Sequence, residues 1–88
     1  MRVSVHPRVR AKHAEITDAD AVAAFRDALR SVPREGTGFP PQWLGVGPDG
    51  RGRILEFVAV QVGEDEWLIF HAMRATTKVL IELGLRRR

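Results

Sequence analysis

The chain of 88 residues contains no cysteine. This absence excludes a disulfide framework, a thiolate metal site and a cysteine nucleophile. The chain also lacks a long hydrophobic run, and two of its longer apolar stretches are Phe57–Val60 and Trp67–Phe70. Both have the length of a strand and are far too short to span a membrane. The segment 1–13 has no apolar core of a signal peptide, and we therefore expect a cytoplasmic protein without a membrane partner.

Neither sign of charge is in large excess. The chain has 14 Lys and Arg against 11 Asp and Glu, a formal net charge of +3, which by itself does not indicate nucleic-acid binding. Nearly all the basic residues are arginine, whose planar, permanently charged guanidinium suits phosphate, although a GC-rich genome would also favour arginine. The apolar share of 44% and the charged share of 28% are typical of a globular protein. We expect one domain over residues 1–88.

The first third of the chain predicts one strand and two helices. Arg2–Val5 has strand character, and Pro7 favours a short basic helix that ends at His13. Thr17 and Asp20 resemble a capping box at the start of a second helix. An apolar stripe at helical spacing continues this helix to Pro33; it consists of Val22, Phe25, Leu29 and Val32.

The rest of the chain predicts a loop, three strands and a final helix. Two glycines and two prolines in the segment 34–41 favour a loop. Strands are expected at Gln42–Gly47, Gly52–Val62 and Trp67–Met73, joined by hairpin turns, and a last helix from Thr76 to Gly84. The predicted class is α+β, an antiparallel meander of three to four strands with the helices packed on one face.

The hairpin turns predict which side chains share a face of the sheet. A two-residue turn at Asp49–Gly50 places Leu44 opposite Leu55, and Trp43 opposite Glu56. The expected core face consists of Leu44, Val46, Leu55, Phe57, Ala59, Leu68, Phe70 and Ala72. The expected opposite face consists of Trp43, Ile54, Glu56, Val58, Val60, Trp67, Ile69, His71 and Met73.

The second hairpin brings a carboxylate and an imidazole together. A four-residue loop at Gly63–Glu66 places Val58 opposite His71, so that Glu56 and His71 are diagonal neighbours about 7–8 Å apart. Such a pair can supply a general base and a general acid. The pair could equally be a plain hydrogen bond or part of a protein interface, and a three-residue turn would move Glu56 to the side of Arg74.

Four short motifs resemble the BrnT-like toxins of type II toxin–antitoxin systems. They are Lys12–His13, Trp43–Gly47, Gly50–Leu55 and Ile69–Thr76. The resemblance implies a RelE-like ribonuclease fold, cleavage of mRNA, and an antitoxin partner of the ribbon-helix-helix type. At the place where such toxins read Ser-Ala-Arg, this chain reads His71-Ala72-Met73. Either the acid–base chemistry has shifted to His71, or the domain binds without cleaving.

The residues could supply the chemistry of the endoribonuclease that the resemblance implies, with no metal or other cofactor and with a 2′,3′-cyclic phosphate as product. Its expected catalytic residues are Glu56 as base, His71 as acid and Arg74 as a phosphate cation. Its expected substrate-binding residues are Arg51, Arg53, Trp43, Lys12 and His13, with Trp67 as a second aromatic that could stack on an unpaired base. A solvated turn at Arg51 and Arg53 and a plain surface at Lys12 and His13 remain alternatives.

Two other functions fit the sequence. A non-catalytic protein-interaction module could use the same half-apolar sheet face, with its two tryptophans, to bind a helix or strand. A DNA-binding regulator fits less well, because the helix expected after Thr17 carries Asp18, Asp20 and Asp27, which phosphate would repel.

Overall fold

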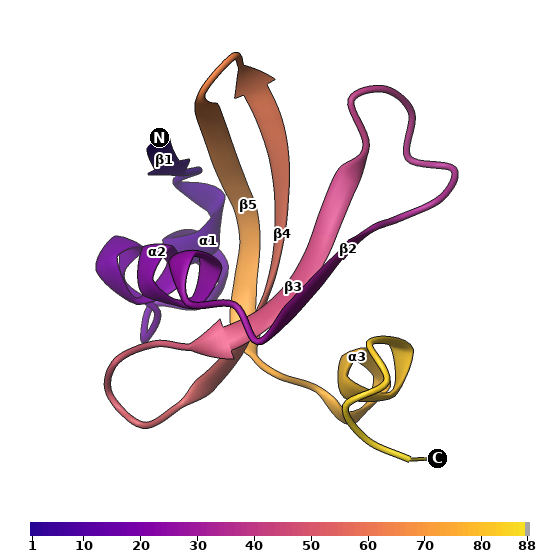
Figure 1. Ribbon diagram of the computed structural model, residues 1–88. Helices are drawn as coiled ribbons and strands as arrows, with labels where there is room; N and C mark the ends of the chain where they lie inside the picture. Colours follow the sequence, from indigo (N-terminus) through magenta and orange to yellow (C-terminus); the bar gives the residue numbers. More distant parts are fainter. Residues whose placement is uncertain (88) are drawn as a thin grey trace.

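The computed structural model describes residues 1–87, and Arg88, the last residue of the predicted domain, lies outside the described residues. Residues 1–87 form a five-stranded sheet and three helices (Figure 1). The elements in chain order are β1 Arg2–Val5, α1 Arg8–Lys12, α2 Asp18–Arg26, β2 Arg30–Pro33, β3 Gln42–Pro48, β4 Ile54–Gly63, β5 Glu66–Arg74 and α3 Thr77–Glu82.

The strands lie in the order β1-β5-β4-β3-β2. Strands β2 to β5 form an antiparallel meander, whereas β1 pairs in parallel with β5. The α+β class is confirmed. The prediction of a purely antiparallel sheet is wrong, because the chain leaves β1 through α1 and α2 and enters the meander at the opposite edge of the sheet.

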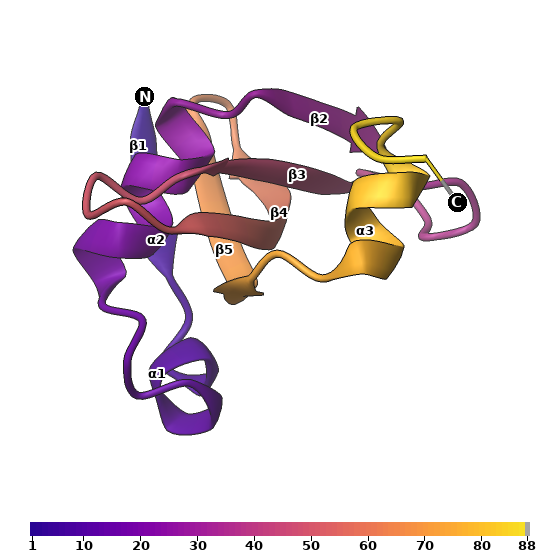
Figure 2. The same ribbon diagram turned by 90° about the horizontal axis from the view of Figure 1, so that it is seen from below.

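The helices cover both faces of the sheet, and the prediction that they share one face is wrong. Figures 1 and 2 show α1 and α2 on one side and α3 on the other. The core under α2 contains Val9, Ile16, Ala21, Ala24, Leu55, Phe57, Ala59, Ile69 and Ala72. The core under α3 contains Leu44, Val46, Val58, Val79 and Leu83. The apolar residues of α3 therefore bury a face that the sequence suggested was open.

The capping box of α2 is confirmed. The Thr17 hydroxyl accepts a hydrogen bond from the Asp20 N–H at 3.1 Å, and the Asp20 carboxylate accepts one from the Thr17 N–H at 2.9 Å. The predicted extent of this helix to Pro33 is wrong, because Arg30–Pro33 pairs with β3 as an edge strand. Pairing satisfies the backbone groups of both strands, and it leaves Leu29 62% exposed.

The first hairpin differs from its predicted register. Pro48 pairs with Ile54, so the connection is a five-residue loop rather than a two-residue turn. Its conformation is fixed by Asp49, whose carboxylate accepts the N–H groups of Arg51 at 2.7 Å and Arg53 at 3.1 Å. The register changes by an odd number of residues, which exchanges the two faces of β3.

As a result, Leu44 and Val46 lie on the same face as Glu56, and Trp43 lies on the opposite face, under α2. The predicted face assignments of β3 are therefore wrong.

The second hairpin has the predicted register in the part that contains Glu56. Val58 pairs with His71 and Glu56 with Met73, as the four-residue loop predicts. Between these pairs and the turn, the register shifts twice. The shift between Val58 and Ala59 directs Ile69 and Trp67 toward α2 and Phe70 toward α3, contrary to the predicted faces of these three residues.

Helix α2 packs directly on β3 at Gly47. A Cβ atom at Gly47 would lie 2.2 Å from the carbonyl oxygen of Ala24. We expect Gly47→Ala to destabilise the fold by about 2 kcal/mol and to lower the Tm by about 10 °C. The control is Gly63→Ala, whose added atom would lie 3.3 Å from the Glu66 Cβ and so needs only a small adjustment. Equal melting temperatures of the two variants would contradict this packing.

Candidate active site

Glu56 of β4 and His71 of β5 form a hydrogen-bonded pair on the sheet face that α3 partly covers. His71 Nε2 lies 2.9 Å from Glu56 Oε2. The two meet because Val58 pairs with His71, which makes Glu56 the diagonal neighbour of the imidazole. The proximity predicted from the second hairpin is confirmed.

Glu56 is buried behind the imidazole, and both of its carboxylate oxygens are hydrogen-bonded. Its side chain is 7% exposed, and its Oε1 accepts hydrogen bonds from the N–H and the hydroxyl of Thr76 at 2.8 and 2.7 Å. Burial alone would raise the pKa of Glu56, but the hydrogen bonds from the Thr76 hydroxyl, His71 and the Thr76 N–H outweigh it and hold this pKa below its usual value. Glu56 is therefore an ionised carboxylate at neutral pH.

An ionised Glu56 fixes the tautomer of His71. A carboxylate only accepts hydrogen bonds, so His71 Nε2 must carry the proton of the 2.9 Å contact. In the neutral imidazole the other nitrogen, Nδ1, then has a free lone pair. Nδ1 is carried by His71, whose side chain is 32% exposed, whereas that of Glu56 is 7% exposed. His71 is therefore the accessible member of the Glu56–His71 pair.

The pair borders a cavity of about 260 Å³. Its lining consists of Arg8, Arg34, Gln42, Leu44, Glu56, Val58, Phe70 and His71. Arg34 also makes two contacts with Glu82 of α3, at 3.2 and 3.4 Å. Within residues 1–87, no carboxylate lies within ion-pair distance of Arg8. Its charge is therefore available to an anion in the cavity.

A second histidine lies beside His71. His13 is the C-cap of α1, and its ring centroid is 6.5 Å from that of His71, with the ring planes at 84°. His13 Nδ1 lies 3.8 Å from a carboxylate oxygen of Glu15. Helix α1 lies next to β5, and this packing brings two imidazoles, each with its own carboxylate, to one place.

The hairpin arginines have a different role from the predicted one. Arg51 contacts the Asp20 carboxylate at 2.7 and 3.1 Å, and Arg53 contacts it at 2.8 Å. Arg53 also pairs with Asp49 and is only 14% exposed. Both guanidinium groups thus attach the hairpin loop to the first turn of α2, on the sheet face opposite His71. The structure does not bring Arg51 and Arg53 to the acid–base pair.

Four further predicted residues do not line the cavity beside the pair. Trp43 packs edge-on against Trp67 at 6.2 Å between centroids, on the α2 side of the sheet, so neither ring faces His71. Arg74 pairs with Leu55 in the ladder and therefore lies on that same side. Lys12 is an exposed residue in the last turn of α1 and does not line the cavity.

Sequence reasoning missed three residues of the site. Arg8 belongs to the predicted basic helix but carried no assigned role, and Arg34 was part of a loop with no assigned chemistry. Thr76 was recognised as a helix start, but its hydrogen bonds to Glu56 need the strand β5 and the helix α3 to meet at Glu56. No local sequence signal reports such contacts.

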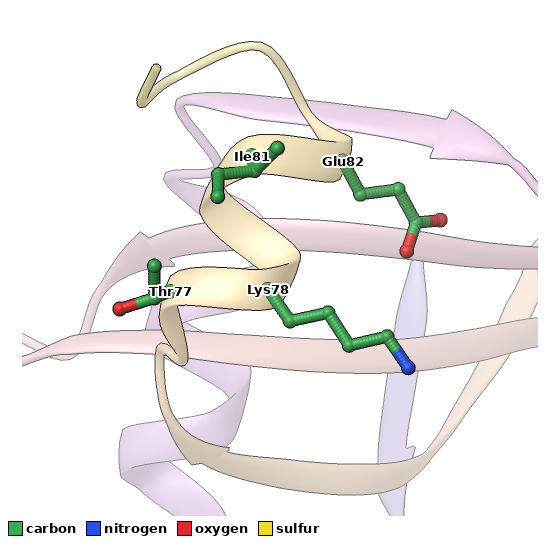
Figure 3. A pocket seen from close by; sticks show the side chains of 4 residues that line it. All are labelled: Thr77, Lys78, Ile81 and Glu82. Carbon is green, nitrogen blue, oxygen red and sulfur yellow. The ribbon is translucent and has the colours of Figure 1, made fainter. Parts of the chain in front are cut away.

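A second, larger cavity of about 590 Å³ lies against α3 (Figure 3). It is lined by Thr77, Lys78, Ile81 and Glu82, and Figure 3 shows Lys78 and Glu82 extending in the same direction from the helix. It contains no histidine and no acid–base pair. The part of the chain that the structure describes has no cluster of three His, Asp or Glu side chains that could hold a metal ion.

Comparison with protein-family models, with curated proteins and with solved structures finds no match for this chain. Among residues 1–87, no helix has both the length and the apolar character that crossing a membrane requires.

Proposed function

We propose that the chain is a metal-independent endoribonuclease, the toxin of a type II toxin–antitoxin pair, and that His71 and His13 transfer the protons. The observation that supports this proposal is a cavity lined by His71, its buried partner Glu56 and Arg8, with the ring of His13 6.5 Å from that of His71. Cleavage of RNA requires a base, an acid and a positive charge near the phosphate, and side chains can supply all three without a metal or other cofactor.

His71 is the base in this proposal, rather than Glu56 as the sequence suggested. Glu56 is buried and has three hydrogen bonds, so it has no free access to a substrate. Its carboxylate orients His71 and stabilises the imidazolium that forms when Nδ1 takes the proton of a ribose 2′-hydroxyl. Arg74 has no part in this mechanism, because it lies on the other face of the sheet.

The remaining steps involve the phosphate. The 2′-oxygen attacks phosphorus, and Arg8 stabilises the negative charge that develops on the phosphate oxygens. The bond from phosphorus to the 5′-oxygen breaks, and protonated His13 gives its proton to this oxygen. The products are a 2′,3′-cyclic phosphate and a 5′-hydroxyl group. Arg34 reaches the same cavity and can bind a neighbouring phosphate when it leaves Glu82.

The test is cleavage of a short RNA by the purified protein in the presence of EDTA. We expect cleavage to continue, with a 2′,3′-cyclic phosphate found by mass spectrometry. The same oligonucleotide with 2′-O-methyl groups should stay intact, because it has no nucleophile. Products with a 3′-hydroxyl, cleavage that stops in EDTA, or no cleavage of any RNA would each contradict the proposal.

The proposed partner is an antitoxin of the ribbon-helix-helix type that covers this cavity. Its gene is expected beside that of the toxin, and co-expression should restore the growth of cells that the toxin arrests. The alternative of a non-catalytic interaction module has less support, because α3 buries part of the sheet face on which it relied, and both tryptophans pack on the other face.

A further inference from the structure

One aromatic side chain is almost completely exposed. Phe39 is 98% exposed, more than any other large apolar residue described. The chain has six aromatic residues, and the other five all pack within or against the two cores; they are Phe25, Trp43, Phe57, Trp67 and Phe70. The fold therefore gains no burial energy from this ring.

The loop that carries Phe39 has a firm base. The Arg34 N–H donates to the Gln42 carbonyl at 2.8 Å. The Thr37 hydroxyl donates to the Arg34 carbonyl at 2.8 Å and accepts the Gln42 N–H at 3.0 Å. These three hydrogen bonds close the loop at its foot. Figure 1 shows the loop between β2 and β3 projecting beyond the sheet, in agreement with the 98% exposure of Phe39.

The foot of this loop is also a wall of the active-site cavity. Arg34 and Gln42 line the cavity together with His71. Phe39 is three residues from Gln42, so its backbone lies at most about 11 Å from the cavity wall. A strand of RNA that extends out of the cavity past Arg34 is therefore within reach of the ring.

A nucleobase fits this position better than a protein partner does. Stable protein interfaces bury about 800 Å² on each side around a cluster of apolar anchors, whereas Phe39 is a single ring with glycine and proline neighbours. Single-stranded nucleic acid needs only a cationic path and isolated aromatic rings on which bases stack. Arg8 and Arg34 supply that path.

We propose that Phe39 stacks on an unpaired base of the RNA substrate, next to the nucleotide that is cleaved. This proposal rests on the proposed ribonuclease function. The ring adds affinity and positions the strand, because every base presents a flat face to it and no particular base is required. Phe39 is a substrate-positioning residue and takes no part in proton transfer.

The test measures the affinity of a 2′-O-methyl RNA octamer, which binds without being cleaved. We expect Phe39→Leu, which keeps the apolar volume but loses the ring, to weaken binding by about 10- to 100-fold. Phe39→Trp should bind as tightly as the unchanged protein. The control is Leu29→Ala, since Leu29 is also an exposed apolar residue but lies between α2 and β2, outside the loop that carries Phe39. All variants should keep the same Tm.

A set of octamers with one abasic position each identifies the stacked base. One abasic octamer should bind the unchanged protein weakly, and Phe39→Leu should show no further loss with it. Equal affinities of Phe39→Leu and the unchanged protein would overturn the stacking proposal and leave the ribonuclease proposal standing. Loss of binding to the co-purified antitoxin instead of RNA would assign Phe39 to a protein contact. No binding of RNA by the unchanged protein would overturn both proposals.

Discussion

Replacing His71 with glutamine is expected to lower the rate of RNA cleavage by about 10³-fold. General acid–base catalysis by one positioned side chain typically contributes 10²- to 10⁴-fold, and His71 is the accessible member of the pair with Glu56. Glutamine keeps a polar side chain of similar reach but cannot take up a proton at neutral pH. The measurement is the single-turnover rate on an RNA oligonucleotide at saturating protein.

The matched control is His6→Asn. His6 is exposed, does not line the cavity, and accepts a hydrogen bond from the Arg8 N–H through Nδ1, which the asparagine oxygen can replace. This variant should cleave at the rate of the unchanged protein. An equal loss in both histidine variants would show that the effect is not specific to the cavity, and full activity of His71→Gln would overturn its role as the base.

The predicted pair of Glu56 and His71 was correct for a simple reason. The registers of β4 and β5 near these residues depend on one short loop, and a residue near the start of one strand meets a residue near the end of the next. Successive side chains of a strand point to opposite faces of the sheet, so the residues that share a face can be read from the sequence once the register is known. The two register shifts occur closer to the turn and cancel before Val58, so they do not disturb the pair.

The first hairpin could not be predicted in the same way. Asp49-Gly50 is a strong signal for a two-residue turn, yet the Asp49 side chain closes a loop of five residues instead. That loop gains stability from contacts of Arg51 and Arg53 with Asp20, more than thirty residues away. The same distant contacts remove both arginines from the predicted phosphate site. Sequence patterns within one hairpin carry no information about such a partner.

The position of His13 could not be predicted from the sequence either. His13 was predicted as a substrate-binding residue, but its position beside His71 depends on α1 packing along β5. The end of α2 is a further example, since the apolar stripe that includes Leu29 and Val32 fits a helix as well as the strand that forms. The chain adopts the strand because β3 otherwise has an unpaired edge.

Replacing Asp20 with alanine is expected to destabilise the fold by about 3 kcal/mol, more than any other single change considered. The carboxylate completes the capping box, which is worth about 1 kcal/mol. It also receives the guanidinium groups of Arg51 and Arg53, and its removal deprives the nearly buried Arg53 of one of its two carboxylate partners. We expect the Tm to fall by about 15 °C.

The matched control is Asp18→Ala. Asp18 is in the same first turn of α2 but is exposed, so its loss should cost only the interaction with the helix dipole, about 0.5 kcal/mol. A chemical denaturation series separates the two variants, and equal midpoints would contradict the role of Asp20 as the common partner of the hairpin and the helix.

The same carboxylate should govern acid stability. Burial alone would raise the pKa of Asp20, but hydrogen bonds from the Thr17 backbone and from Arg51 outweigh it and lower this pKa from 3.8 to about 2. Because the folded-state pKa lies below the unfolded one, the ionised group stabilises the fold above about pH 4, and this contribution disappears as the pH falls toward 2. The free energy of unfolding of the unchanged protein should therefore decrease between pH 5 and pH 2 more steeply than that of Asp20→Asn. Parallel curves would mean that the two arginines hold the hairpin without the charge of Asp20.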